Sequence, residues 1–286
     1  MKVDFHCHST ASDGTLSPSA VADSAVRGGF AALALTDHDN CDGIGELVAK
    51  SGGGTRLYAG VELSIEPGGG FDKFHLLGLG IDPGNLELKE LLRRILAGRN
   101  GRNERILANF ARIGIEIAAD DLAAYAHGEV LARPHFARWL MDHGHVQSVA
   151  EGFERYLLPD SPAETRCYEE RWHPPQEESF HAIHAAGGIA VMAHPKFWRR
   201  GWRREGCDFA AAAAELARLK EAGLDGLECL YSTNSSAEDV GFTRIADSLG
   251  LLKSAGSDFH GANKPTISLG MEVSEEFIAP LLEVLQ

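Results

Sequence analysis

Short apolar runs that end in histidine or acidic residues recur along the whole chain. The first covers residues 2–9, where Val3 and Phe5 form one face of an expected β-strand and the pair His6 and His8 follows at its end. Residues two apart in a strand point to the same side, so both imidazoles can reach one ion. Comparable runs carry histidine or acidic residues at positions 37–39, 62, 75, 194 and 258–260. Burying such side chains is costly unless they are paired or bind metal, so the series predicts one site for several ions.

Helical stretches separate these strands and indicate the fold class. Residues 17–27 are expected to form a capped helix, and further helices are expected over 176–186, 209–222 and 237–249, each of which leads through glycine into an apolar strand. Repeated strand–helix units with apolar strands indicate a parallel sheet, either doubly wound or closed into a barrel. Barrels place functional residues at the C-terminal ends of their strands, where these histidines and carboxylates lie. The sequence therefore predicts an α/β fold with a (β/α) barrel of eight strands or fewer.

The middle of the chain has a different pattern, with helical periodicity and no strand signal from about residue 85 to 166. We therefore expect residues 1–84 and 167–286 to form a discontinuous barrel domain, and residues 85–166 to form an all-helical insertion or lid. Within it, residues 99–105 are rich in arginine, in a chain whose formal net charge is −14 at pH 7. Two interpretations stay open: a solvated helix face, or a set of phosphate ligands, for which arginine is well suited.

The predicted substrate contacts follow from the second interpretation. Arg133 precedes a proline at an expected helix start, and we interpret it as a phosphate ligand rather than a simple cap. The candidate substrate-binding residues are Arg99, Arg102, Asn103, Arg133 and His135. Residues 198–204 form a second basic and aromatic stretch that can stack a base and hold phosphate, with an ordinary surface loop as the equal alternative.

Taken together, these motifs resemble the PHP (polymerase and histidinol phosphatase) superfamily of metal-dependent phosphoesterases. The matching segments are HCHS at 6–9, SDG at 12–14, TDH at 36–38, GVE at 60–62, HLLG at 75–78, AHP at 193–195 and GSDFHG at 256–261. The segment RPHFA at 133–137, with Phe153 and Tyr156-Leu157, is similar to the branch of nucleoside 3′,5′-bisphosphate phosphatases and 5′→3′ exoribonucleases. The resemblance implies a distorted seven-stranded (β/α) barrel with a helical insertion.

The resemblance also implies three metal positions. One ion would take His6, His8, Glu62 and Asp258, a second would share Glu62 and add His75 and His194, and a third would take Asp13, His38 and His260. Mixed imidazole and carboxylate ligands suit transition metals, and we expect two to three divalent ions, Mn²⁺ before Fe²⁺ or Zn²⁺. Cys7 should face away from the ions, and Thr36, Asp37 and Asp39 should support His38 rather than bind metal.

Clustered divalent ions lower the pKa of a shared water and offset the charge on phosphoryl oxygens, which is the chemistry of phosphate ester hydrolysis. We expect a metal-bridging hydroxide as the nucleophile, with Asp258 as a candidate for orienting it. The predicted activity removes the 3′-phosphate from nucleoside 3′,5′-bisphosphates, such as adenosine 3′,5′-bisphosphate to AMP, and extends to short 5′-phosphorylated RNA. Two alternatives stay open: a small-metabolite phosphatase of the histidinol phosphate type, and a non-catalytic PHP interaction module, against which the complete set of ligand types counts.

Composition limits the expected partners. A net charge of −14 argues against binding duplex DNA, which favours a basic face, but it leaves room for a nucleotide or short single-stranded RNA at a locally cationic site. The chain has no apolar run of membrane-spanning length and no signal-peptide pattern after Met1, so no membrane partner is expected. The five cysteines are scattered, which predicts reduced thiols and a cytoplasmic location.

Overall fold

The computed structural model describes residues 1–50, 54–66, 72–125, 131–198 and 206–285 of the 286-residue chain. Its strands form one sheet in the order β7-β6-β5-β4-β3-β2-β1-β8. The strands are β1 (Lys2–Cys7), β2 (Ala32–Leu35), β3 (Arg56–Ile65), β4 (Phe74–Leu79), β5 (Ile189–Met192), β6 (Gly226–Tyr231), β7 (Leu252–Gly256) and β8 (Met271–Glu272).

The sheet curls into a nearly closed barrel because the segment after β7 returns to β1. The Asp258 amide donates to the His6 carbonyl at 2.7 Å, and the His8 amide donates to the Phe259 carbonyl at 2.9 Å. Cys7 and Phe259 also form an isolated parallel bridge. The short strand β8 pairs antiparallel with β1. The predicted α/β barrel is confirmed, with this two-residue strand added to the seven that form the barrel wall.

Strand β4 runs against both of its neighbours, so the sheet is not wholly parallel as the repeating pattern predicted. It pairs antiparallel with β3 and with β5, whereas the pairs β1–β2, β2–β3, β5–β6 and β6–β7 are parallel. The connection over 66–73 is too short for the dozen or more residues that a parallel crossover needs. His75 therefore lies near the start of its strand. It is nevertheless at the same end of the barrel as the residues at the C-terminal ends of the parallel strands.

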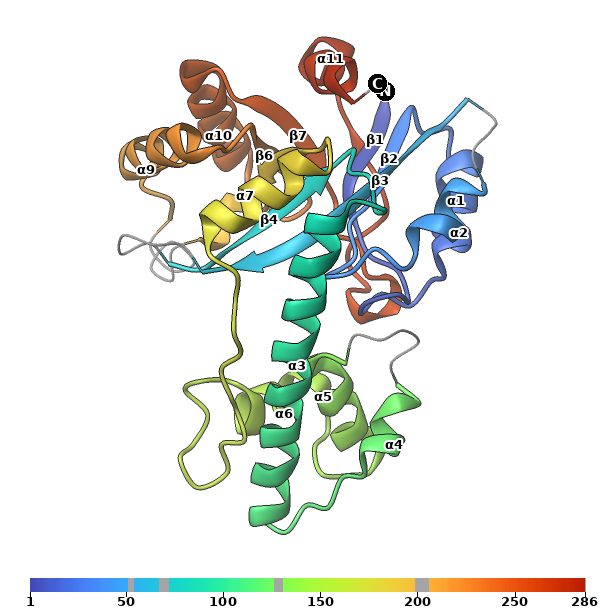
Figure 1. Cartoon of the computed structure of the whole chain (residues 1–286), viewed down its shortest axis with the longest axis vertical. Helices are drawn as coiled ribbons and strands as arrows, with labels where there is room; N and C mark the ends of the chain where they lie inside the picture. Colours follow the sequence, from blue (N-terminus) through green and yellow to red (C-terminus); the bar gives the residue numbers. More distant parts are fainter. Residues whose placement is uncertain (51–53, 67–71, 126–130, 199–205, 286) are drawn as a thin grey trace.

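Helices cover the outside of the barrel (Figure 1). They are α1 (Pro18–Arg27), α2 (Ile44–Val48), α7 (Gln176–Ala185), α9 (Phe209–Ala222), α10 (Ser236–Leu249) and α11 (Glu275–Val284), with short 3-10 turns at η2 (Pro195–Phe197) and η3 (Gly261–Asn263). Leu216 and Phe242 pack into the same buried cluster as Val61 and Leu76, so α9 and α10 are anchored on the sheet. On the opposite flank, Val21 and Leu47 of α1 and α2 bury against β2.

Every regular element that the structure describes between residues 85 and 166 is a helix. Its elements are α3 (Leu86–Arg112), α4 (Ala119–Ala123), α5 (Arg133–Asp142), α6 (Val149–Gly152) and the π-helix η1 (Phe153–Leu157). They pack around their own cluster, which includes Phe110, Phe136 and Tyr156. Cys167 joins this cluster from one residue beyond the expected boundary. The division into a barrel domain and a lid domain stays a prediction.

Helix α3 links the two hydrophobic clusters. Its first half places Leu88, Leu91 and Ile95 in the barrel cluster, and its second half places Ile106 and Phe110 in the insertion cluster. Figure 1 shows the helix leaving the barrel and running into the group of insertion helices. The cationic residues at 99–103 lie between the two halves, at the junction. No helix in the described ranges is both long and apolar enough to cross a membrane.

Candidate metal centre

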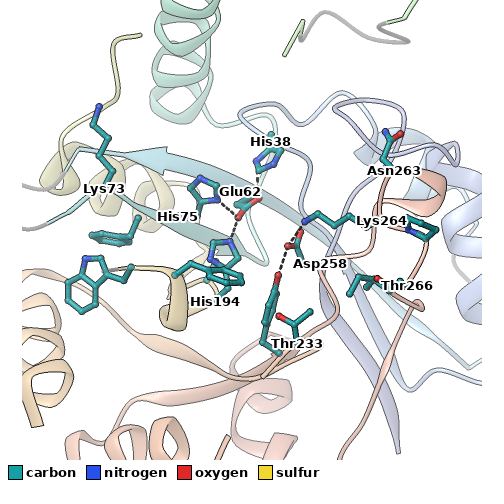
Figure 2. A pocket seen from close by; sticks show the side chains of 17 residues that line it. His38, Glu62, Lys73, His75, His194, Thr233, Asp258, Asn263, Lys264 and Thr266 are labelled. Carbon is teal, nitrogen blue, oxygen red and sulfur yellow. Dashed lines mark hydrogen bonds and ion pairs between the residues drawn. The ribbon is translucent and has the colours of Figure 1, made fainter. Parts of the chain in front are cut away.

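All nine predicted metal ligands meet at one end of the barrel. Glu62, on β3, lies at the centre of this group, and its side chain is almost completely buried. Five imidazoles surround its carboxylate, with nitrogen–oxygen distances of 2.8 to 3.3 Å: His6, His8, His38, His75 and His194. Figure 2 shows His38, His75 and His194 facing Glu62 from different sides.

Two aspartates complete the group on the side of His260. The Nε2 atom of His260 lies 3.3 Å from Asp13 Oδ1, and its Nδ1 atom lies 3.3 Å from Asp258 Oδ1. His8 Nε2 lies 3.3 Å from the same Asp258 oxygen. His38 Nε2 lies 3.9 Å from Asp13 Oδ2, which joins this side to the Glu62 side. The ligand types therefore form one continuous cluster.

The ligand atoms divide into four overlapping groups, each with its atoms within 4.8 Å of one another: His8 with Asp13, His38 and His260; His6 with Glu62 and His194; His6 with His8 and Asp258; and His38 with Glu62 and His75. Glu62 is shared between two groups, as expected of a bridging carboxylate. His75 and His194 fall into different groups, although the resemblance implied one shared ion. Which residues hold which ion stays a prediction.

Several buried atoms at this centre lack a hydrogen-bond partner. They are His6 Nε2, both ring nitrogens of His8, His38 Nδ1 and Glu62 Oε2. Buried polar atoms in folded proteins are nearly always hydrogen-bonded, so a cluster of such atoms calls for a missing partner. Neutral imidazole nitrogens and carboxylate oxygens are ligands for divalent transition metals. The residues therefore fit a site for several metal ions.

Three residues other than glycine in the described chain have positive φ, and all lie at this site. They are Asp39 at 55°, His194 at 29° and Asp258 at 57°. This left-handed region is unfavourable for residues with a Cβ atom and is often stored at functional sites. His194 and Asp258 each follow the end of a strand, so the unusual backbone turns both side chains back toward the barrel mouth.

Glu228 holds His6 and His194 from beneath the centre and was not predicted. Its Oε1 atom lies 3.0 Å from His6 Nδ1, and its Oε2 atom accepts from the His194 amide at 2.5 Å. A carboxylate on Nδ1 fixes the imidazole so that Nε2 faces the ions. Gly256 makes room for this pair, because a Cβ atom there would lie 2.3 Å from both Glu228 Oε1 and His6 Cβ. The signal that could have found Glu228 is the acidic residue inside the apolar run 226–231.

Two further buried carboxylates hold the loops that carry the ligands. Asp37 accepts from the Ser9 amide at 2.8 Å and from the Ser9 and Ser12 hydroxyls at 2.6 Å. Asp4 accepts from the Ser257 amide at 3.0 Å and hydroxyl at 2.6 Å, and burial raises the pKa of Asp4 to about 6. These bonds fix the segments that bear His8, Asp13 and Asp258.

The side chains of Thr36, Asp37 and Asp39, which were expected to support His38, make their described hydrogen bonds to other residues. Asp37 holds the Ser9–Ser12 loop, and the Thr36 hydroxyl donates to the Cys7 carbonyl at 3.2 Å rather than to His38. Asp39 turns toward arginines, as described below. Cys7 packs with Val21 in the cluster under α1, and its thiol donates to the Ala34 carbonyl at 3.3 Å, away from the centre.

A tyrosine and a lysine contact the outer oxygen of Asp258. Tyr231 Oη donates to Asp258 Oδ2 at 2.8 Å, and Lys264 Nζ lies 2.6 Å from the same oxygen. Asp258 Oδ1 is left facing His6, His8 and His260. Figure 2 shows Lys264 reaching across the site mouth toward Asp258. Neither residue was predicted, because neither stands in a local sequence motif. Only the folded barrel brings them to Asp258.

Arginines from α3 and from the chain after the insertion meet beside His38. Arg99 and Arg171 both pair with Asp39 Oδ2, with Arg99 Nε at 2.8 Å and Arg171 Nη2 at 2.8 Å. Burial raises the pKa of Asp39, but the two guanidinium groups outweigh it and hold the pKa well below its usual value. Arg171 was not predicted, since it lies in an irregular stretch with no motif.

Arg102 and Arg133 add further positive charge to this arginine cluster, which comprises Arg99, Arg102, Arg133 and Arg171. Burial, followed by the nearby charges of the other three, lowers the pKa of Arg102 to about 9. Arg102 Nη2 is buried without a hydrogen-bond partner, and Arg133 Nη1 donates to the Leu157 carbonyl at 3.1 Å. Asp39 and the exposed Glu170 offset only part of this charge, so the cluster is suited to an anion.

The other two predicted substrate contacts make internal hydrogen bonds. Asn103 Nδ2 donates to the Leu131 carbonyl at 2.9 Å and its oxygen accepts from Arg102 Nε at 3.0 Å. His135 Nδ1 accepts from the Ala132 amide at 3.0 Å. The Asn103 bond ties α3 to the segment before α5, and the His135 bond lies at the start of α5. Contact with substrate stays a prediction for both residues, as it does for the arginines.

A cavity of about 730 Å³ opens over the metal centre (Figure 2). Its floor is formed by the predicted ligands His38, Glu62, His75, His194 and Asp258. Its walls are formed by Lys73, Phe74, Ala193, Phe197, Trp198, Tyr231, Thr233, Asn263, Lys264, Pro265, Thr266 and Ile267. Of the basic and aromatic stretch 198–204, Trp198 lies in this wall, and residues 199–204 lie outside the described residues.

Comparison with known proteins agrees with this geometry. Residues 4–134 match the PHP domain family. The chain is 35% identical over 263 residues to a 3′,5′-nucleoside bisphosphate phosphatase of Chromobacterium violaceum, covering 90% of this chain and 87% of the relative. It is 36% identical over 262 residues to a 5′-3′ exoribonuclease of Haemophilus influenzae, covering 91% and 90%.

The fold has a close structural relative as well. An amidohydrolase from Chromobacterium violaceum, with sulfate bound and no metal, superposes with a TM-score of 0.83 at 31% identity, over 99% of this chain and 96% of that one. Together with the activities named for these relatives, the barrel and its buried imidazole and carboxylate cluster define a class of hydrolases with a candidate site for several metal ions. The chain belongs to the PHP family of phosphoesterases, and its barrel is of the PHP type that the sequence predicted.

Proposed function

We propose that the protein hydrolyses the bond between phosphorus and the 3′ oxygen of 5′-phosphorylated nucleosides. Its simplest substrates are nucleoside 3′,5′-bisphosphates, such as adenosine 3′,5′-bisphosphate, which gives AMP and phosphate. The observation that carries the proposal is the arginine cluster beside the metal centre. A cluster with excess positive charge, next to a phosphoryl-binding centre, suits a substrate with two phosphates.

The protein's own residues have separate roles in this reaction. The nine predicted ligands would hold two to three divalent ions, with Mn²⁺ expected. Such ions, when bound, lower the pKa of water and offset charge on the phosphoryl group. Glu228 sets the orientation of His6. Tyr231 and Lys264 hold Asp258 Oδ2, which leaves Oδ1 available to orient the attacking water. Arg102 would bind the 5′-phosphate, which its unpaired buried nitrogen supports.

The activities named for the two relatives can be explained by breakage of the same bond. A 3′,5′-nucleoside bisphosphate phosphatase and a 5′-3′ exoribonuclease can both act on a 5′-phosphorylated nucleoside and break its O3′–phosphorus bond. The proposal therefore extends to short 5′-phosphorylated RNA. No duplex DNA or membrane is part of it.

Phosphate release from adenosine 3′,5′-bisphosphate tests the proposal, with histidinol phosphate and AMP as comparison substrates. Each is measured with added Mn²⁺ and with a chelator. We expect Mn²⁺-dependent formation of AMP from the bisphosphate at a kcat/KM at least 100-fold above the other two. Comparable slow turnover of all three would discard the bisphosphate specificity and favour a small-metabolite phosphatase. No metal-dependent hydrolysis of any of them would favour an interaction module.

A further inference from the structure

The cavity over the metal centre extends away from the arginine cluster. None of Arg99, Arg102, Arg133 and Arg171 is among its described lining residues. Its outer wall is formed by Phe197 and Tyr231 on one side and by the loop of Lys264 and Thr266 on the other. The metal centre thus lies between two differently built sites, a cationic one toward α3 and a partly aromatic one across the barrel mouth.

We propose that this cavity is a subsite for the second nucleotide of 5′-phosphorylated RNA, whose base packs against Phe197. The proposal rests on the proposed function, because it assumes that the first nucleotide's 5′-phosphate occupies the arginine cluster. It adds a binding site on the other side of the bond that is broken. It also makes the protein a phosphodiesterase as well as a phosphatase.

The chemistry of the step is compatible with this arrangement. A water oxygen bonds to phosphorus, the O3′–phosphorus bond breaks, and O3′ takes up a proton to become the 3′-hydroxyl of the first nucleotide. The phosphoryl group then leaves as phosphate from a bisphosphate, or stays on the 5′ oxygen of the second nucleotide in RNA. The attacking water approaches phosphorus opposite O3′, so the 5′ oxygen of the second nucleotide projects to the side of this line, and the cavity over the metal centre offers room for the nucleotide that it carries.

The size of the cavity exceeds what a phosphate group needs. Pockets that enclose small organic ligands have volumes of roughly 300 to 1,000 Å³, and this one is about 730 Å³. Its floor binds the reacting group, and the remaining space continues along Phe197, Thr233 and Thr266. The phosphoryl group alone does not fill that extension, which leaves room for a further part of the substrate.

The lining has the chemistry of a nucleotide site. The half-buried Phe197 ring is held by Tyr231, with ring centroids 5.7 Å apart and planes at 89°, and by His194 at 5.6 Å. Its placement is therefore fixed, and stacking on a fixed aromatic ring strengthens binding of an unpaired base by about 10- to 100-fold. Thr233 and Thr266 offer hydroxyls, and Lys264 offers a cation, to ribose and phosphate.

Three substrates separate this subsite from the phosphatase activity. They are adenosine 3′,5′-bisphosphate, its 3′-methyl phosphodiester and the 5′-phosphorylated diadenylate, each assayed with the Mn²⁺-loaded protein. The methyl diester has the same reacting bond as the diadenylate but no second base. The quantity compared within each variant is kcat/KM for the diadenylate divided by kcat/KM for the methyl diester, so that general damage to the site cancels.

We expect a ratio of at least 10 in the wild type and near 1 in Phe197→Ala and Phe197→Leu. Phe197→Tyr, which keeps an aromatic ring, and Val240→Ala on exposed α10 should keep the wild-type ratio. A wild-type ratio near 1, or a ratio that survives Phe197→Leu, would overturn the subsite while leaving bisphosphate hydrolysis intact.

A binding measurement keeps the two proposals distinguishable. If the bisphosphate is not hydrolysed, the proposed function fails, and the subsite is tested by calorimetric binding of the diadenylate and the methyl diester to the chelator-treated protein. We expect the diadenylate to bind at least 10-fold more tightly, with the difference lost in Phe197→Leu. Equal affinities in the wild type would overturn the subsite.

Discussion

Glu228 Oε1 lies 3.0 Å from His6 Nδ1, and both side chains are completely buried beneath the metal centre. The other oxygen of the same carboxylate accepts from the His194 amide, so one side chain positions two predicted ligands. Because these ligands come from β1 and from the end of β5, Glu228 ties opposite parts of the barrel mouth together. Its effect on the site should therefore exceed that of a single hydrogen bond.

Replacing Glu228 with glutamine should weaken metal binding by about 10- to 100-fold, the usual cost of removing a partner that orients a ligand. The glutamine amide cannot supply a full negative charge to His6 Nδ1, so His6 becomes a poorer ligand. Metal content after dialysis at a series of free Mn²⁺ concentrations measures the change. Glu272→Gln, at an exposed position on β8, removes the same charge and serves as control. Equal metal affinity in both variants would contradict the assigned role.

Metal uptake should release protons. Burial lowers the pKa of His38, but the charges of Glu62 and Asp13 outweigh it and raise that pKa to about 9 in the metal-free protein. Below pH 9 the imidazole thus holds a proton that an ion must displace, so Mn²⁺ affinity should rise with pH and level off above about 9. Calorimetric titration at pH 7.5 in two buffers of different ionisation enthalpy measures the release. Identical heats in both buffers would contradict it.

Replacing Arg102 with methionine should stabilise the ligand-free fold and weaken substrate binding. Its positive charge is buried near three other arginines, so removal should raise the free energy of unfolding by about 1 to 3 kcal/mol. The same change should raise KM for adenosine 3′,5′-bisphosphate by about 10- to 100-fold. Denaturant unfolding and steady-state kinetics test the two opposite effects. Arg93→Met, on the exposed side of α3, should change neither, and parallel losses in Arg102→Met would refute an anion site.

Replacing Asp39 with asparagine should destabilise the protein by about 3 to 5 kcal/mol, because Arg99 and Arg171 would be left as buried charges without a counterion. The pKa of Asp39 lies well below its unfolded value, so its stabilising contribution is present above about pH 4 and is lost only in stronger acid. The difference between variant and wild type should therefore be constant from pH 5 to 9. Asp23→Asn, in an exposed pair with Lys50, is the matched control and should lie within about 0.5 kcal/mol of wild type.

The metal cluster could be anticipated because each ligand stands in a short local pattern. His6 and His8 follow an apolar run, and Glu62 interrupts another, so local sequence reveals residues that need a polar partner. Which ligands face each other depends on strand order, which local patterns do not contain. Glu228 carries the same signal as Glu62, an acid within an apolar strand, and was overlooked because no histidine accompanies it.

The direction of β4 and the role of Arg171 illustrate two other limits. The turn-forming residues Pro67 to Gly70 between two apolar strands are a hairpin signal, and the expectation of repeating strand–helix units obscured it. Arg171 has no periodicity or motif around it. Its partner Asp39 lies 132 residues away in sequence, so only tertiary structure brings the pair together.

The left-handed backbone at Asp39, His194 and Asp258 has a consequence for adaptation of this protein. Such conformations cost of order 1 to 3 kcal/mol each, and here they coincide with the positions that carry function. At His194 and Asp258, selection for heat resistance alone would therefore favour glycine or asparagine, whereas Asp39 would be kept as the counterion of Arg99 and Arg171. The expected product of such a selection is a more stable but inactive protein. Activity must therefore be screened together with stability whenever this barrel is engineered.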